Sequence, residues 1–248
     1  METFVQVLEV WGDFACFTRP ELKVERFSYP VITPSAARGI FEAIYWKPEF
    51  RWEIRCIEVL SPLQYIALRR NEVKDKVPSE RTIHQWMSGK SVPEPIWADG
   101  DRDLLGSDMK GRTQRQTMAL KDVRYRIHAE PIPWYVEKNP VPGITAQFIR
   151  RAKQGKCFYQ PYFGCREFPA YFRLVEEGKE EQIPALTENT DIGWMLYDVF
   201  DLNHPGTSNS PPAISLFYAC IENGILKVPP YNSNEVKKSK LVGGINAE

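Results

Sequence analysis

The segment from Thr33 to Leu60, TPSAARGIFEAIYWKPEFRWEIRCIEVL, predicts a helix that runs directly into a strand. This pair of elements is the starting point for the fold prediction. Thr33 is a suitable N-cap, and Pro34 suits the first helical turn, where its missing N–H has no partner to lose. An apolar stripe repeats at helical spacing and consists of Ala37, Ile40, Phe41 and Ile44. Pro48 disfavours helical geometry in the residue before it, so the helix ends there, and residues 50–60 alternate as a strand.

The flanking segments predict further strands and a second helix. Alternating apolar residues predict strands at residues 3–11, 63–73 and 115–132, followed by an aromatic-rich strand pair at 157–174. Residues 142–156 predict a helix, with Thr145 as candidate cap and Gly155 as its stop. Residues 74–110 lose periodicity and contain several prolines and glycines, which predicts a long loop.

The order of these elements favours an α+β fold. We expect a ferredoxin-like (RRM-like) N-terminal domain with an antiparallel sheet over residues 1–175, with an excursion at 74–110. An acidic linker at 176–192 leads into a smaller β-rich C-terminal domain over 176–248. In this second domain, Asn223-Gly224 between two apolar strands predicts a two-residue hairpin.

The composition favours an intracellular globular protein without a metal or cofactor. Hydrophobic residues make up 43% and the formal net charge is zero, so no global field attracts nucleic acid. The five cysteines form no CxxC pair, so neither zinc spacing nor a disulfide framework is expected. Phosphate-loop, dinucleotide and HExxH motifs do not occur. Without a signal peptide or an apolar run of membrane length, we expect a cytoplasmic protein with no membrane contact.

Local charge is nevertheless uneven, and the strand at 115–132 carries much of it. In GRTQRQT, residues 111–117, a phosphate groove is favoured over a plain polar loop, because its side chains donate to phosphate oxygens. The donors of interest are Arg112, Arg115 and Gln116. Further along, alternate residues share one strand face, which is expected to be strongly basic unless it is merely solvated. These residues are Arg124, Arg126 and His128.

Two other sites carry chemistry of interest. The aromatic segment 162–172 is expected mostly in the core, with Arg166 at the surface or paired with a carboxylate. Tyr45 falls in the last turn of the first helix, near Arg38 and Lys47, where it serves either as a core tyrosine or in proton transfer. RNA can be cut without metal, since its own 2′-hydroxyl attacks the adjacent phosphate when a protein aligns it and stabilises the developing charge. Tyrosine, lysine, arginine and histidine suffice for this chemistry.

Four segments in order resemble the CRISPR-associated repeat-processing endoribonucleases of subtype I-C, the Dvulg type, in the RAMP superfamily of RNA-binding proteins. They are TPSAARGIFEAIYWKPEFRW, LRRNEV, RTQRQTMALKDVRYRI and YFGCREFPAYF. The resemblance implies metal-independent cleavage of precursor CRISPR RNA at the base of the repeat hairpin, leaving a 2′,3′-cyclic phosphate. It also implies that the protein stays on the 5′ handle of the guide. There it joins the backbone and large subunits of the surveillance complex, which finds target DNA.

Family members use a tyrosine and an adjacent lysine-histidine pair. The tyrosine corresponds to Tyr45, while the pair falls on Arg115-Gln116 or on Lys121-Asp122, neither of which supplies a histidine. His128 and His84 are the candidate replacements. The resemblance therefore implies Tyr45 as the group that aligns or deprotonates the 2′-hydroxyl, with Lys121 or Arg115 stabilising the phosphate. The expected RNA contacts are Arg38, Lys47, Arg69, Arg70, Arg112, Gln116, Arg124, His128 and Arg166.

Two alternatives stay open beside the nuclease. A non-catalytic subunit that only binds and caps the 5′ handle is favoured by the missing histidine. A general single-strand RNA chaperone would show no preference for a hairpin.

Overall fold

The computed structural model describes residues 4–22, 24–100, 102–106, 109–135, 140–176, 183–206 and 211–239. The chain forms two compact units. The first contains Met1–Ile66 with Met118–Glu248, and the second contains Ala67–Thr117. None of the helices in the described ranges is both long and apolar enough to cross a membrane.

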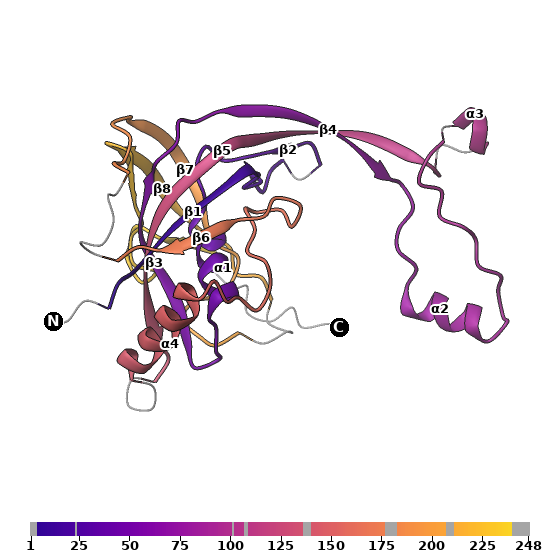
Figure 1. Ribbon diagram of the computed structural model, residues 1–248. Helices are drawn as coiled ribbons and strands as arrows, with labels where there is room; N and C mark the ends of the chain where they lie inside the picture. Colours follow the sequence, from indigo (N-terminus) through magenta and orange to yellow (C-terminus); the bar gives the residue numbers. More distant parts are fainter. Residues whose placement is uncertain are drawn as a thin grey trace. The chain divides into compact units, whose positions relative to one another are not determined.

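The first unit is built on a mostly antiparallel sheet (Figure 1), which confirms the predicted α+β fold class. The strands follow the order β10-β8-β9-β3-β5-β1-β6, while β2 and β4 pair with β5 and β7 pairs with β8. Their bounds are β1 Gln6–Ala15, β2 Arg26–Phe27, β3 Phe50–Val59, β4 Tyr65–Val73, β5 Arg112–Pro133, β6 Tyr171–Leu174, β7 Thr190–Asp198, β8 Ser215–Glu222, β9 Ile225–Lys227 and β10 Lys237–Lys238. Strand β4 from Ala67 on and strand β5 up to Thr117 belong to the second unit.

Helix α1, Pro34–Ile44, forms as the sequence predicts. The Thr33 side chain accepts a hydrogen bond from the Ala36 N–H and so caps the first turn. The apolar stripe is buried, and Phe41 packs 5.0 Å from the ring of Trp52 on β3. This single buried face fixes how α1 lies against the sheet.

Helix α4, Val141–Lys153, packs on the same side of the sheet as α1 (Figure 1), because its Phe148 contacts Phe41 at 5.3 Å and Trp52 at 4.7 Å. The prediction that Thr145 caps this helix is wrong, since the N-cap is Pro140. Proline has no side-chain acceptor, and the helix begins without a side-chain capping bond. The predicted stop at Gly155 is confirmed by its left-handed backbone, φ +63°, just after the helix.

Two local predictions differ from the structure. The segment 157–174 forms only the short β6 and one isolated bridge between Tyr162 and Pro169, because its prolines and glycine interrupt strand pairing. The segment 74–110 is not a plain loop, because it contains α2, Glu80–Met87, and the short α3, Arg102–Leu105. The Ser79 side chain caps α2 by accepting from the Thr82 N–H, a signal present in the sequence.

The C-terminal strands extend the same sheet. The predicted hairpin is confirmed, since Asn223 and Gly224 adopt φ values of +48° and +73° between β8 and β9. Strand β9 then pairs with β3, and Cys56 lies opposite Lys227. The predicted linker falls partly on residues 177–182, which lie outside the described residues. A division into domains at 175/176 therefore stays a prediction.

Candidate functional site

Tyr45 lies directly after the last helical residue of α1, so the helix ends before the last turn in which the proline signal places Tyr45. It is the C-cap, with extended backbone angles, and its N–H donates to the Phe41 carbonyl at 2.9 Å. Its ring packs 5.7 Å from Phe50, the first residue of β3, and only 6% of the residue is exposed. Among the described residues, its hydroxyl has no hydrogen-bond partner. The ring is thus held in the core while its polar group remains available.

Three contacts anchor the end of α1 and so fix Tyr45. The Arg151 side chain of α4 donates through Nε to the Ile44 carbonyl at 2.5 Å, and the Phe158 N–H donates to the Ala43 carbonyl at 2.7 Å. The Trp52 indole N–H donates to the Tyr45 carbonyl itself at 2.9 Å. Carbonyls at a helix C-terminus lack partners within the helix, and these donors supply them from three separate segments.

The Tyr45 pocket, a hollow of about 440 Å³, lies between the end of α1 and the start of α4. Its lining residues are Tyr45, Lys47, Glu49, Phe50, Pro140, Gly143, Ile144 and Gln147. Lys47 is exposed and forms no ion pair with any described residue, so its charge is available to a ligand. The amide of Gln147 and the positive end of the α4 dipole also favour an anion. The pocket therefore combines a hydroxyl, a cation, the carboxylate of Glu49 and hydrogen-bond donors.

Lys121, one of the two cations expected beside Tyr45, lies elsewhere on the sheet. On β5 it is opposite Phe14, whereas Phe50, which packs on Tyr45, is opposite Pro133. Twelve positions of one strand separate Lys121 from Pro133, or about 40 Å at roughly 3.3 Å per residue. The structure does not bring Lys121 to Tyr45. Arg115, the other expected cation, belongs to the second unit.

The expectation of a strongly basic face on β5 is wrong, because acids on neighbouring strands neutralise it. Arg124 donates to Glu9 of β1 at 2.7 Å, and a second donor to Glu9 comes from Arg173 of β6 at 2.9 Å. Burial raises the pKa of Glu9, but the bonds and charges of Arg173 and Arg124 outweigh it, and the pKa lies below its ordinary value. Glu58 of β3 similarly accepts from Arg126 at 2.5 Å.

His128 shares Glu58 with Arg126, with Nε2 at 2.6 Å from its carboxylate. The other candidate replacement, His84, lies on α2 in the second unit, 3.8 Å from Glu80. No described histidine lines the Tyr45 pocket. In the described ranges, no group of three or more His, Cys, Asp and Glu residues is arranged to hold a metal ion.

Arg38, an expected RNA contact, is engaged by two carboxylates of the protein. It donates to Asp198 at 2.9 and 3.1 Å and to Glu42 at 2.5 Å. Burial alone would lower the pKa of Arg38, but Asp198 and Glu42 raise it. Burial raises the pKa of Glu42 despite the opposing charge of Arg38. Arg38 therefore links α1 to the end of β7.

The other expected RNA contacts are at or near the surface. In the second unit, Arg70 pairs with Glu72 at 3.1 Å and Arg112 with Asp99 at 2.9 Å, while Arg69 and Gln116 are exposed. Arg166 of the first unit is exposed, as predicted. Sequence reasoning placed Lys47 near Tyr45, as the Tyr45 pocket confirms, but missed Glu49 and Gln147. The IYWKPE segment contains the signal for Glu49, but nothing local signals Gln147.

The sheet and its helices define a class of protein. Over 95% of this chain and 97% of the other, the fold matches a solved CRISPR-associated protein with a TM-score of 0.60 at 18% identity, a likeness of fold alone. Residues 6–229 match the family model described as CRISPR-associated protein, Cas5, of the Cas5d type. The chain belongs to this family.

Two curated relatives carry the same printed name, CRISPR pre-crRNA endoribonuclease Cas5d. The one from Mannheimia succiniciproducens is 44% identical over 237 residues, covering 93% of this chain and 97% of the relative. The one from Thermus thermophilus is 39% identical over 241 residues, covering 92% and 93%. The family that the sequence resembles is thereby confirmed.

Proposed function

We propose that this chain is an endoribonuclease that cleaves precursor CRISPR RNA, the activity in the names of both relatives. The identity of 44% and 39% over nearly the whole of each chain supports this. The observation that carries the proposal is the Tyr45 pocket, in which a tyrosine hydroxyl without a described partner and a lysine without a described ion-pair partner line the same hollow.

The reaction is metal-independent transesterification at the base of the repeat hairpin. The 2′-oxygen attacks the adjacent phosphorus as its proton leaves, the bond from phosphorus to the 5′-oxygen breaks, and that oxygen takes up a proton. The products are a 2′,3′-cyclic phosphate and a 5′-hydroxyl. Tyr45 aligns or deprotonates the 2′-hydroxyl. Lys47 stabilises the charge on the pentacoordinate phosphate, in place of Lys121 or Arg115, and carries protons that the leaving oxygen can take.

The arrangement of β1, β3, β5 and β6 supports a ferredoxin-like N-terminal domain over residues 1–175. Along the sheet they run β3-β5-β1-β6, with α1 after β1 and α4 after β5, which is the split βαβ pattern. Residues 176–248 form the smaller β-rich part.

Exposed cations bind the RNA backbone. In the second unit we assign phosphate contacts to Arg69 and Arg112, with Arg70 and Gln116 as further donors, and in the first unit to Arg166. The side chains of Arg38, Arg124 and His128 are already bonded to carboxylates. They contact RNA only through N–H groups that these carboxylates do not occupy. The chain stays in the cytoplasm on the 5′ handle of the guide. It has no cofactor, and it meets target DNA through the backbone and large subunits of the surveillance complex.

A non-catalytic subunit that caps the 5′ handle is the second candidate. The observation that favours it is the lack of any described histidine around the Tyr45 pocket. Such a subunit would bind repeat RNA and leave it intact.

Incubating the purified protein with labelled repeat RNA in EDTA separates the candidates. The matched control is the same RNA with one 2′-deoxy nucleotide at the cut site. We expect cleavage of the first RNA only. Dependence on magnesium or cleavage of the deoxy RNA would refute the mechanism, while binding without cleavage would establish the capping subunit.

A further inference from the structure

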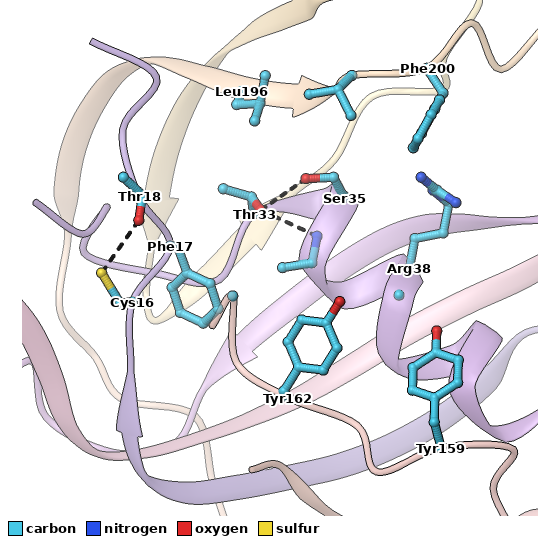
Figure 2. Close-up of a pocket in the computed structure, with 14 residues that line it drawn as sticks. Cys16, Phe17, Thr18, Thr33, Ser35, Arg38, Tyr159, Tyr162, Leu196 and Phe200 are labelled. Carbon is cyan, nitrogen blue, oxygen red and sulfur yellow. Dashed lines mark hydrogen bonds between the residues drawn. The ribbon is translucent and has the colours of Figure 1, made fainter. Parts of the chain in front are cut away.

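A second pocket of about 390 Å³, which we call the Tyr162 pocket, lies beside the N-terminal half of α1 (Figure 2). Its volume is in the range of small-ligand sites, roughly 300–1,000 Å³. Its walls come from residues 16–18 directly after β1, from α1 and its Thr33 cap, from residues 159–164 and from β7 with the turn after it. We propose that this pocket receives one unpaired nucleobase of the RNA that the chain cleaves, an inference that rests on the proposed function.

Aromatic rings line the pocket from its interior to its opening. Phe17 is 3% exposed and Tyr162 is half-buried, whereas Tyr159 and Phe200 are each 50% exposed. Half-exposed rings that line one hollow offer their faces to a ligand, and they suit bases because every base has a π-face. Stacking on such rings is how proteins hold unpaired RNA bases.

Hydroxyl groups are placed to meet the edge of a base. In Figure 2, the hydroxyls of Tyr159 and Tyr162 point toward α1, and Thr33 and Ser35 lie at its start. Neither tyrosine hydroxyl bonds to a described residue. Burial, and the nearby charge of Glu42, raise the pKa of Tyr159, so its hydroxyl stays a donor at neutral pH. Hydroxyls both donate and accept, so they fit the mixed edge of a base.

The charge balance argues against a phosphate in the same place. Arg38 is the one cation among the lining residues that the structure describes, and its guanidinium is held by Asp198 and Glu42. Two carboxylates around one guanidinium leave a local excess of negative charge. A neutral ring enters such a site without repulsion, whereas a phosphate does not.

Both walls are fixed before any ligand arrives. Asp198 Oδ1 accepts from the Val199 and Phe200 N–H groups at 2.8 and 3.0 Å, which sets the turn that presents the Phe200 ring. On the other wall, Gly164 has φ +78°, and a Cβ there would lie 2.1 Å from the Cys16 carbonyl oxygen. Only glycine allows this close approach of residues 159–164 to β1. A rigid pocket loses little entropy when a ligand binds.

The Tyr162 pocket lies on the route to the Tyr45 pocket. Two further hollows connect the pockets through shared lining residues. Tyr159 lines the Tyr162 pocket and the first of these hollows, Trp46 lines both hollows, and Phe50 lines the second hollow and the Tyr45 pocket. From Ala36 to Tyr45 the helix rises about 14 Å at roughly 1.5 Å per residue. One strand of RNA can therefore place its cut site at Tyr45 and a nearby unpaired base in the Tyr162 pocket.

An abasic scan tests this placement. Repeat RNA with a 2′-deoxy nucleotide at the cut site is given a single abasic residue at each unpaired position beside the hairpin, and its Kd is measured. With the unaltered protein, we expect one position to weaken binding roughly 5- to 100-fold. Phe200→Ala and Tyr162→Ala should weaken binding of the intact RNA by a similar factor. In these variants an abasic residue at that position should cause no further loss of affinity, so the abasic penalty disappears. Tyr218→Ala, another half-exposed aromatic on β8, should leave the penalty in place.

A penalty that survives both pocket variants would overturn the inference while leaving the cleavage activity intact. The inference is also overturned if Phe200→Ala leaves the abasic scan unchanged but abolishes binding to another subunit. The pocket would then receive a protein side chain. Binding with no cleavage of all-ribose RNA refutes the nuclease activity alone, since the scan still measures the pocket. No binding of repeat RNA refutes both.

Discussion

The face of β5 and the pocket at the end of α1 contain similar residue types but differ in how their charges are balanced. On β5, Arg124 bonds to Glu9, and Arg126 and His128 share Glu58. In the Tyr45 pocket, Lys47 has no described carboxylate partner.

The difference separates two uses of charge. A cation whose partner is a buried carboxylate holds neighbouring strands together, and removing either member leaves the other unpaired. A cation without such a partner can form its charge-assisted hydrogen bonds with a ligand instead. On this basis, substitutions on β5 should change stability, and substitutions in the Tyr45 pocket should change cleavage.

The largest effect is expected from Tyr45→Phe. The ring keeps its packing on Phe50 while the hydroxyl is lost, so cleavage of repeat RNA under single-turnover conditions should slow about 10²- to 10⁴-fold. RNA affinity and the free energy of unfolding should stay close to their original values. Tyr171→Phe, a half-exposed tyrosine on β6, is the matched control. Full activity in Tyr45→Phe would remove this residue from the chemistry.

Lys47→Met compares the two regions directly. Methionine retains the apolar stem without the charge, and we expect cleavage to slow about 100-fold because the developing phosphate charge loses its cation. Lys121→Met is the rival variant, about 40 Å of strand away at roughly 3.3 Å per residue. It should cut at nearly the original rate. If Lys121→Met alone slowed cleavage, the assignment of the cation to Lys47 would be wrong.

Sequence patterns predict features whose signals are local. The helix α1, its Thr33 cap and the Asn223-Gly224 hairpin depend on neighbouring residues, and all three are confirmed. The acid partners of β5 could not be predicted, because Glu9 lies 115 residues before Arg124. The helix α2 was missed although Ser79 signals its start, because nearby prolines and glycines favoured a loop.

The same limit applies to the candidate site. Pro48 predicts that the helix ends close to Tyr45, whereas the approach of Gln147 depends on the packing of Phe148 against Phe41 and Trp52. Matched by sequence alone, the resemblance implies a cation on β5, either Lys121 or Arg115. In space, the lysine two residues after Tyr45 is the one that shares its pocket.

On the β5 face, Glu9→Gln should lower stability. Glu9 is 1% exposed and accepts from two arginines, so the loss of its charge should cost about 1–3 kcal/mol in the free energy of unfolding, measured with urea. Glu21→Gln removes an exposed partner 3.9 Å from Arg19 and should cost about 0.5 kcal/mol or less. Cleavage by folded Glu9→Gln should remain normal. An unchanged free energy of unfolding would contradict a structural role for the β5 ion pairs.

The smallest effect concerns the pH dependence of that same carboxylate. Since the pKa of Glu9 is lower in the folded chain than the value of about 4.3 for an unfolded glutamate, its contribution to stability is complete above that pH. It is lost as the pH falls through the folded pKa, because both states then bind the proton. The difference in unfolding free energy between the original chain and Glu9→Gln should stay constant from pH 7 to about 5 and shrink below about 4.3. A difference that grew on acidification would mean that the arginines do not stabilise the charged form of Glu9.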